Sequence, residues 1–190
     1  ALVLMIGDHI NKYLLNDTVA WLYDAGRLTM PLFVFVLAYN LARPGAFESG
    51  AYRRTMIRLA VFGALASPAF LALGSLVNGW WPLNILFTLF VLTATLRLLE
   101  MGRPQGYMAA GLAFALGGSL VEFWWPALAF GVAIWIYTTQ PSVPALILAF
   151  VSCAALGYIN GNPWALASIL ILLVAPFVAL PCPRLRWFFY

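Results

Sequence analysis

Apolar runs of helical length, separated by short polar or proline- and glycine-containing breaks, follow one another along the whole chain. The breaks include RPGAFESGAYRR, NGWWP, GRPQG, TTQPS and NGNP, and proline and glycine at such positions end helices. This pattern predicts eight helices, near residues 1–16, 27–42, 54–76, 83–100, 105–121, 124–138, 142–158 and 164–181. The expected fold class is therefore all-α.

Composition indicates where these helices lie. Hydrophobic residues make up 64% of the chain and charged residues 8%, whereas soluble domains carry roughly 25% charged residues. We expect a polytopic membrane helix bundle, with residues 1–190 as one domain and about eight transmembrane helices. The range is six to eight, because several runs are shorter than the roughly 20 residues that cross a bilayer comfortably. Residues 105–121 and 124–138 are the weakest pair and could form one re-entrant unit.

The basic residues predict an orientation. With the N-terminus inside, the cytoplasmic side holds eight arginines, whereas Lys12 and Arg27 lie on the opposite side. These eight are Arg43, Arg53, Arg54, Arg58, Arg97, Arg103, Arg184 and Arg186. An excess of basic residues on the cytoplasmic side is typical of membrane proteins, so we expect both termini in the cytoplasm. Topology accounts for the positive net charge, and we expect no nucleic-acid partner.

The first apolar run, ALVLMIGDHINKYLL, contains Asp8, His9, Asn11 and Lys12, and His9 is the only histidine of the chain. Asp8 and His9 lie about 100° apart around a helix, so Asp8 is poorly placed to orient His9. Lys12, at i+4, and Arg27 are the candidate partners of Asp8. Ionisable groups at membrane depth are usually functional, but a structural ion pair beside a neutral, hydrogen-bonded His9 is the alternative.

An imidazole accepts protons near neutral pH, so His9 is the candidate base of this cluster. Asp8 could hold the imidazolium, and Arg27 or the asparagines of the same half, including Asn84, could donate hydrogen bonds to an oxyanion. Such a set suits acyl transfer, and it equally suits a proton relay in a transporter. Cys153 and Cys182 have no ligand-like spacing, so we expect no metal site.

The cytoplasmic arginines allow two interpretations. They could serve topology and contact lipid headgroups, or they could bind the phosphates of a donor, which arginine forks match well. In the second case Asn40 could line a passage from the arginines toward His9.

Three motifs carry a resemblance to a known family. The segments LVLMIGDHIN, AGRLTMPLFVFVLAYNLARPG and NILF, taken together, resemble the TraX family of conjugative pilin acetyltransferases, closest to its TrbP branch. The resemblance covers the chain in helix order and is strongest over residues 1–45. It implies an enzyme of the bacterial inner membrane that N-acetylates the pilin subunit, with acetyl-CoA as the donor substrate.

Carried onto this sequence, the resemblance implies a catalytic set of His9, Asp8, Arg27 and Asn84. The residues expected to bind the donor are Asn40, Arg43, Arg53, Arg54, Arg58 and Arg97. The expected partners are the pilin subunit and membrane lipids. Two other interpretations remain, a non-catalytic assembly factor for the pilus and a small proton-coupled transporter.

Overall fold

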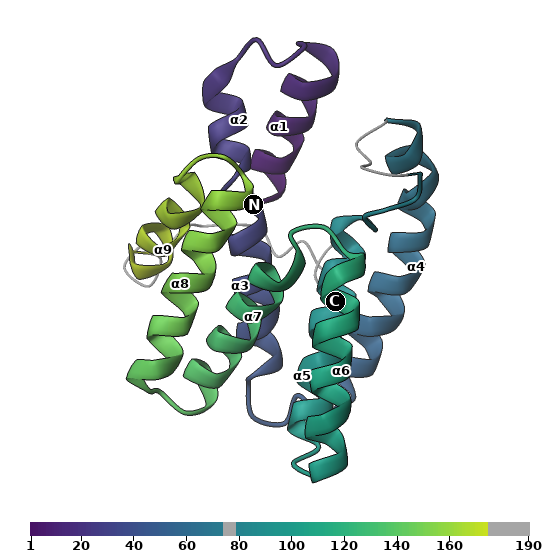
Figure 1. Cartoon of the computed structure of the whole chain (residues 1–190), viewed down its shortest axis with the longest axis vertical. Coiled ribbons are helices and arrows are strands. Elements are labelled where there is room, and N and C mark those ends of the chain that lie inside the picture. The colour runs from purple at the N-terminus through teal and green to yellow at the C-terminus, as the bar shows by residue number, and fades with distance from the viewer. Residues whose placement is uncertain (74–78, 175–190) are drawn as a thin grey trace.

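The computed structural model describes residues 1–73 and 79–174, in which nine α-helices follow one another (Figure 1). They are α1 Leu2–Leu14, α2 Ala20–Gly26, α3 Thr29–Leu41, α4 Ala51–Ala72, α5 Ile85–Glu100, α6 Pro104–Leu120, α7 Trp124–Thr139, α8 Val143–Ile159 and α9 Trp164–Val174. The ends of the predicted helices 54–76 and 164–181 lie partly outside the described residues, as do Cys182, Arg184 and Arg186. The prediction of an all-α fold is confirmed.

The second predicted helix, 27–42, corresponds to α3, and the prediction missed the short helix α2 before it. The helical path begins at Ala20, and α2 continues into α3 through a short joint at Arg27 and Leu28. The sequence suggested a polar connection here because Asp17, Thr18 and Asp24 interrupt the apolar pattern. In the structure, only the first two lie in the turn after α1, and the helix accommodates Asp24.

Two helical stretches are long and apolar enough to cross a membrane by length and composition, Ala20–Leu41 through the α2–α3 joint and Ala51–Ala72. The apolar helices α8 and α9 are shorter. The apolar character of the helices agrees with a membrane protein, and the number of spans stays a prediction.

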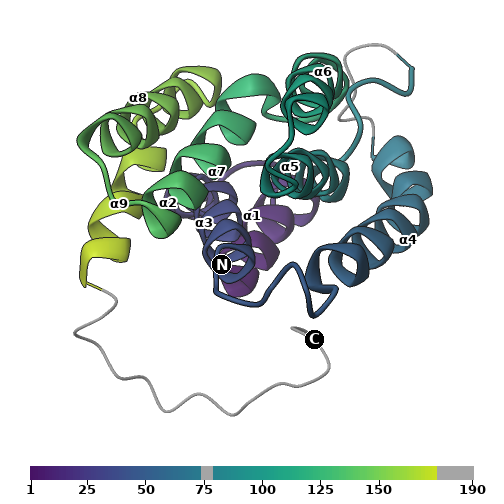
Figure 2. The same cartoon turned by 90° about the horizontal axis from the view of Figure 1, so that it is seen from below.

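The core lies where α3, α5 and α7 meet. Val34, Leu92, Leu96 and Phe130 are almost fully buried there, and α5 and α7 approach so closely that a Cβ on Gly131 would lie 2.4 Å from the Leu92 side chain. The view along the bundle places α4 on one side of this core and α8 with α9 on the other (Figure 2). The central helices thus form the rigid body to which the outer helices attach.

The two ends of the bundle differ in composition. The loops that join α3 to α4 and α5 to α6 lie at the lower end in Figure 1. These loops and the adjoining ends of α4 and α5 carry six of the seven described arginines, all except Arg27. The α1–α2 hairpin lies at the upper end, and its turn is organised by the buried Asn11. The Asn11 side chain accepts a hydrogen bond from the Val19 N–H at 2.9 Å and donates one to Asp17 at 3.5 Å. Asn11 therefore has a structural role.

Candidate functional site

A cavity of about 420 Å³ lies between α1, α4, the start of α5 and the turn from α6 to α7. Its volume falls within the roughly 300–1,000 Å³ typical of small-ligand sites. Apolar side chains of α4, among them Ala66, Ala69 and Phe70, form one wall. The polar residues that line the cavity are Asp8, His9, Lys12, Tyr13, Arg27, Thr29, Asn84 and Glu122. All four residues predicted as catalytic therefore line one cavity.

Asp8 and Arg27 form an ion pair at this cavity. The Arg27 Nη2 group donates to both carboxylate oxygens of Asp8, at 2.9 and 3.1 Å, and both side chains are less than one-fifth exposed. The guanidinium also lies 4.3 Å from the centre of the Tyr23 ring, a cation–π contact. Arg27, one of the two partners that the sequence left open for Asp8, thus pairs with it in the structure.

Gly26 permits this ion pair. It ends α2 opposite Asp8, and a Cβ at this position would lie 2.5 Å from the Asp8 Cγ. Any larger residue would therefore push the carboxylate away from Arg27 or separate α1 from α2. The glycine that precedes Arg27 in the sequence thus has a steric explanation.

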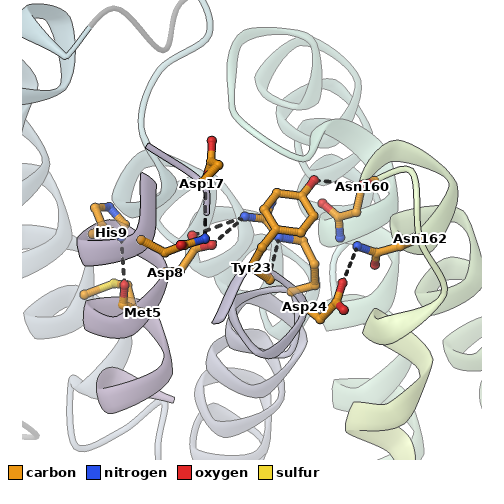
Figure 3. A network of polar contacts seen from close by, with 10 residues as sticks. Met5, Asp8, His9, Asp17, Tyr23, Asp24, Asn160 and Asn162 are labelled. Carbon is orange, nitrogen blue, oxygen red and sulfur yellow. Dashed lines mark hydrogen bonds and ion pairs between the residues drawn. The ribbon is translucent and has the colours of Figure 1, made fainter. Parts of the chain in front are cut away.

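A backbone carbonyl fixes the tautomer of the neutral His9 ring. Its Nδ1 atom lies 2.8 Å from the Met5 carbonyl oxygen, one helical turn earlier (Figure 3). A carbonyl oxygen can only accept, so Nδ1 carries the hydrogen and Nε2 of the neutral ring has a free lone pair. The Asp8 carboxylate contacts Arg27 and makes no hydrogen bond with His9 in the described structure. The predicted stabilisation of the imidazolium by Asp8 would therefore act without direct contact between the two side chains.

Asn84 lines the cavity, but its amide group is already used. Its side-chain oxygen accepts from the Leu86 N–H and caps α5, while its NH₂ group donates to the Gly63 carbonyl and the Ser67 hydroxyl of α4. Because both amide hydrogens have acceptors, Asn84 has none left for an oxyanion. In the structure Asn84 joins α4 to α5, and its donor role stays a prediction.

Glu122 is a site residue that the sequence-based set did not include. It lies in the turn between α6 and α7, half-buried, and its backbone is fixed by hydrogen bonds to Leu83 and from Thr88 at 2.9 and 2.8 Å. Burial raises the pKa of its carboxyl to about 7, although Lys12, the Ile85 N–H and Arg27 act in the opposite direction. The cavity therefore holds a carboxyl group whose pKa lies near neutral pH.

Thr29 is the second residue that the set did not include. It is 5% exposed, it lines the cavity, and its hydroxyl has no hydrogen-bond partner in the described part of the chain. No sequence signal pointed to Thr29, because a threonine in an apolar helix is common. For Glu122 a signal existed, since a carboxylate between two apolar helices is unusual.

A hydrogen-bond network extends from this site across α2 (Figure 3). The Tyr23 hydroxyl donates to the Asn160 carbonyl at 3.3 Å, and the Asn162 amide donates to Asp24 at 3.5 Å. Asn160 and Asn162 belong to the turn between α8 and α9. These asparagines thus position α2 and do not line the cavity.

The residues predicted to bind the donor lie elsewhere. Asn40, Arg43, Arg53, Arg54, Arg58 and Arg97 are all exposed, near the end of α3, the start of α4 and the end of α5. None of them lines the cavity, and Arg54 donates to the Ser49 carbonyl in its own loop. Within residues 1–73 and 79–174, no three His, Cys, Asp or Glu side chains gather as metal ligands.

Comparison with known proteins completes the description of the site. A family model described as TraX protein matches residues 1–190, the whole chain. No curated protein and no solved structure matches it. The match does not distinguish the TrbP branch, which stays a prediction from the quoted motifs. Because the family model spans the entire sequence, the chain belongs to the TraX family, which is associated with conjugative pilin processing.

Proposed function

We propose that the protein is a membrane N-acetyltransferase, which moves an acetyl group from acetyl-CoA to the N-terminal amine of the conjugative pilin. The observation that carries the proposal is the state of His9. Its ring lines a ligand-sized cavity, and its Nδ1–H is held by Met5, so that Nε2 can accept a proton. Membership of the TraX family supports the choice of acceptor.

The amine requires a base. A terminal ammonium has a pKa near 7.7–8.0, so it must lose a proton before its nitrogen can attack a thioester. His9 is the only histidine of the chain, and imidazole is the side chain best suited to accept a proton near neutral pH. In the proposal the acceptor nitrogen therefore lies beside His9 Nε2.

The transfer consists of one substitution at the acetyl carbon. The ammonium first loses one proton to solvent. The N–C bond then forms while Nε2 takes a second proton from the nitrogen, and the tetrahedral oxyanion collapses with loss of the C–S bond. The imidazolium gives that second proton to the departing sulfur, and the third proton stays on the amide nitrogen. The products are the amide and free coenzyme A thiol, and His9 returns to its starting state.

Arg27 and Asp8 support this step in different ways. The ion pair fixes α1 against α2, so Asp8 is a positioning residue for its neighbour His9. Arg27 also retains the Nη1 N–H groups, which form no hydrogen bond within the described residues and can face a developing oxyanion.

The arginine end is the proposed entrance for the donor. Arg58 precedes the first cavity-lining residue of α4, Ala66, by eight positions, which is about 12 Å along a helix. Phosphates bound by Arg53, Arg54 and Arg58, with Asn40, Arg43 and Arg97 on the neighbouring helices, would leave the extended arm of the donor to bridge that distance. The proposal places this end in the cytoplasm of a bacterial inner membrane, where acetyl-CoA is available.

The experiment that tests the proposal reconstitutes the protein in vesicles with purified mature pilin and acetyl-CoA carrying a labelled acetyl group. The intact mass of the pilin is then measured, with protein-free vesicles as the control. A mass gain of one labelled acetyl group at the N-terminus, dependent on the protein, is the expected result. If the pilin mass is unchanged, the proposal fails and the non-catalytic assembly factor becomes the better interpretation.

A further inference from the structure

The acceptor amine of the proposed reaction is positively charged when it reaches the protein, because a pKa near 7.7–8.0 keeps it mostly protonated at neutral pH. Taking an ammonium group out of water costs free energy unless the site offers it hydrogen-bond acceptors and an opposite charge. His9 Nε2 offers an acceptor lone pair and no negative charge. A carboxylate that lines the same cavity and forms no ion pair of its own would supply both.

Two carboxylates line the cavity, and one of them is already paired. Asp8 forms its ion pair with Arg27, which is the only ion pair within residues 1–73 and 79–174. Glu122 therefore has no ion-pair partner among these residues. The group that donates toward its carboxylate is the Ile85 N–H, at the first position of α5. Since a carboxylate has two acceptor oxygens, one of them is left for another donor.

The unpaired oxygen of Glu122 is accessible. Where the structure describes side chains, the oxygen and nitrogen atoms that are sealed from solvent without a hydrogen-bond partner belong to Thr29 and Thr95 alone. Glu122 is half-buried, and its unpaired oxygen is not one of these sealed atoms, so this oxygen keeps accessible surface. The backbone N–H and carbonyl of Glu122 are bonded to Leu83 and Thr88, which leaves the side chain to border the cavity.

The Glu122 carboxylate lies near the helix face that carries the proposed base. Lys12 and Arg27 line the cavity as well, and the charge of each acts on the Glu122 carboxyl. Lys12 follows His9 by three positions on α1, so these two side chains share one face of that helix. His9 and Glu122 therefore border one cavity, from α1 and from the α6–α7 turn, and a small group between them can contact both.

We propose that Glu122 binds the ammonium group of the acceptor, so that the unpaired carboxylate oxygen accepts one N–H of the terminal nitrogen while His9 Nε2 faces another. This inference rests on the proposed function and identifies what distinguishes a free N-terminus from a blocked one. The hydrogen that faces Glu122 is the one that stays on the amide nitrogen, so no bond of the carboxylate is made or broken. Acetylation removes the positive charge, which weakens the interaction and favours release of the product.

The test measures the binding of two synthetic peptides that carry the N-terminal sequence of the mature pilin, one with a free amine and one N-acetylated. Binding to the protein in vesicles is measured without acetyl-CoA, so that no transfer takes place. We expect the unchanged protein to bind the free-amine peptide about 10- to 100-fold more tightly, the range for one charge-assisted hydrogen bond. Glu122→Gln keeps the shape of the side chain without its charge, and it should abolish this preference.

Glu100→Gln is the matched control. Glu100 lies at the end of α5, is exposed and does not line the cavity, so this variant removes the same charge from a position outside the site. It should keep the full preference for the free amine. Melting temperatures of both variants, measured in parallel, should stay near that of the unchanged protein.

The inference is overturned if the unchanged protein binds the two peptides equally or binds neither, if Glu122→Gln keeps the preference, or if Glu100→Gln loses it to the same extent. Transfer of the labelled acetyl group to pilin, measured with the same vesicles, separates this result from the proposed function. Transfer without a preference that depends on Glu122 rejects the amine site and leaves the transferase intact. A preference that depends on Glu122, without any transfer, rejects the acetyltransferase and leaves the amine site.

Discussion

The two polar ends of this bundle hold their charged residues in opposite ways. At the cavity end, Asp8 and Arg27 form an ion pair, His9 is held by Met5, and Asn84 has all its amide groups bonded. At the other end, the six predicted donor-binding residues are exposed. The first arrangement depends on the relative positions of several helices, whereas the residues of the second lie on the surface near the ends of α3, α4 and α5.

This difference predicts which single substitutions should change stability or activity. A partly buried ion pair that loses one member leaves an uncompensated charge, which is costly. Exposed charges contribute little individually, because water and salt screen them. We therefore expect sharp, residue-specific effects around the cavity and small, cumulative effects at the arginine end.

The largest expected effect is that of His9→Ala. Loss of the general base should lower the acetylation rate by roughly 10²–10⁴-fold, with the amount of folded protein unchanged. Ile10→Ala is the matched control, because Ile10 is the next residue of α1, is 41% exposed and does not line the cavity. Initial rates in the vesicle assay provide the measurement, and near-normal transfer by His9→Ala would reject the base assignment.

Gly26→Ala comes next. The added methyl group overlaps the Asp8 carboxylate, so we expect a loss of about 1–3 kcal/mol in folding free energy from overpacking. Displacement of Asp8 also displaces His9, and we expect the rate to fall about 10- to 100-fold. Gly111→Ala of α6, where a Cβ meets nothing within 4 Å, should change neither property. Equal behaviour of the two variants in thermal melts and rate assays would contradict the steric role of Gly26.

The double substitution Arg53→Ala with Arg54→Ala should have a smaller effect. If these side chains bind donor phosphates, the KM for acetyl-CoA should rise by about 3- to 10-fold, with kcat kept and the effect weakened by salt. Arg103→Ala is a control at the same end of the bundle that lies outside the predicted donor set. If the KM of the double variant is unchanged, or if it rises equally in Arg103→Ala, then Arg53 and Arg54 do not bind the donor. Their roles would then be to set the topology and to contact lipid headgroups.

The smallest expected effect is the pH dependence carried by Glu122. Its pKa of about 7 in the folded protein lies above the ordinary value of 4.5, so the folded state favours the protonated carboxyl. That contribution to stability is present at low pH and is lost as the pH rises through about 7. Glu122→Gln mimics the neutral form and should flatten the fall in melting temperature between mildly acidic and mildly alkaline buffers. If the melting temperatures of Glu122→Gln and of the unchanged protein fall equally with pH across that range, the raised pKa is contradicted.

The sequence predicted the parts of this molecule that depend on local pattern. The helix positions followed from apolar runs and breaks, and the polar cluster of the first helix was visible because His9 and Asp8 interrupt such a run. The start of α2 was missed because Asp24 resembles a loop residue until its contact with Asn162 is known.

The site residues that escaped prediction depend on contacts between distant segments. Glu122 reaches the cavity because Leu83 pairs with Val121, which brings the α6–α7 turn to the start of α5. The lack of a hydrogen-bond partner for the Thr29 hydroxyl within the described chain is a property of packing that a single sequence does not display. The engagement of Asn84 with α4 is likewise a tertiary feature.

The contact between His9 and the Met5 carbonyl keeps the tautomer of the proposed base within five residues of one helix. In many enzymes the tautomer of a histidine is set by a carboxylate from another segment, so that a shift between segments alters it. Here the hydrogen on Nδ1 does not depend on where α1 lies relative to its neighbours. A change in the fit of the helices would therefore alter the position of the ring, and not which of its nitrogens carries the hydrogen.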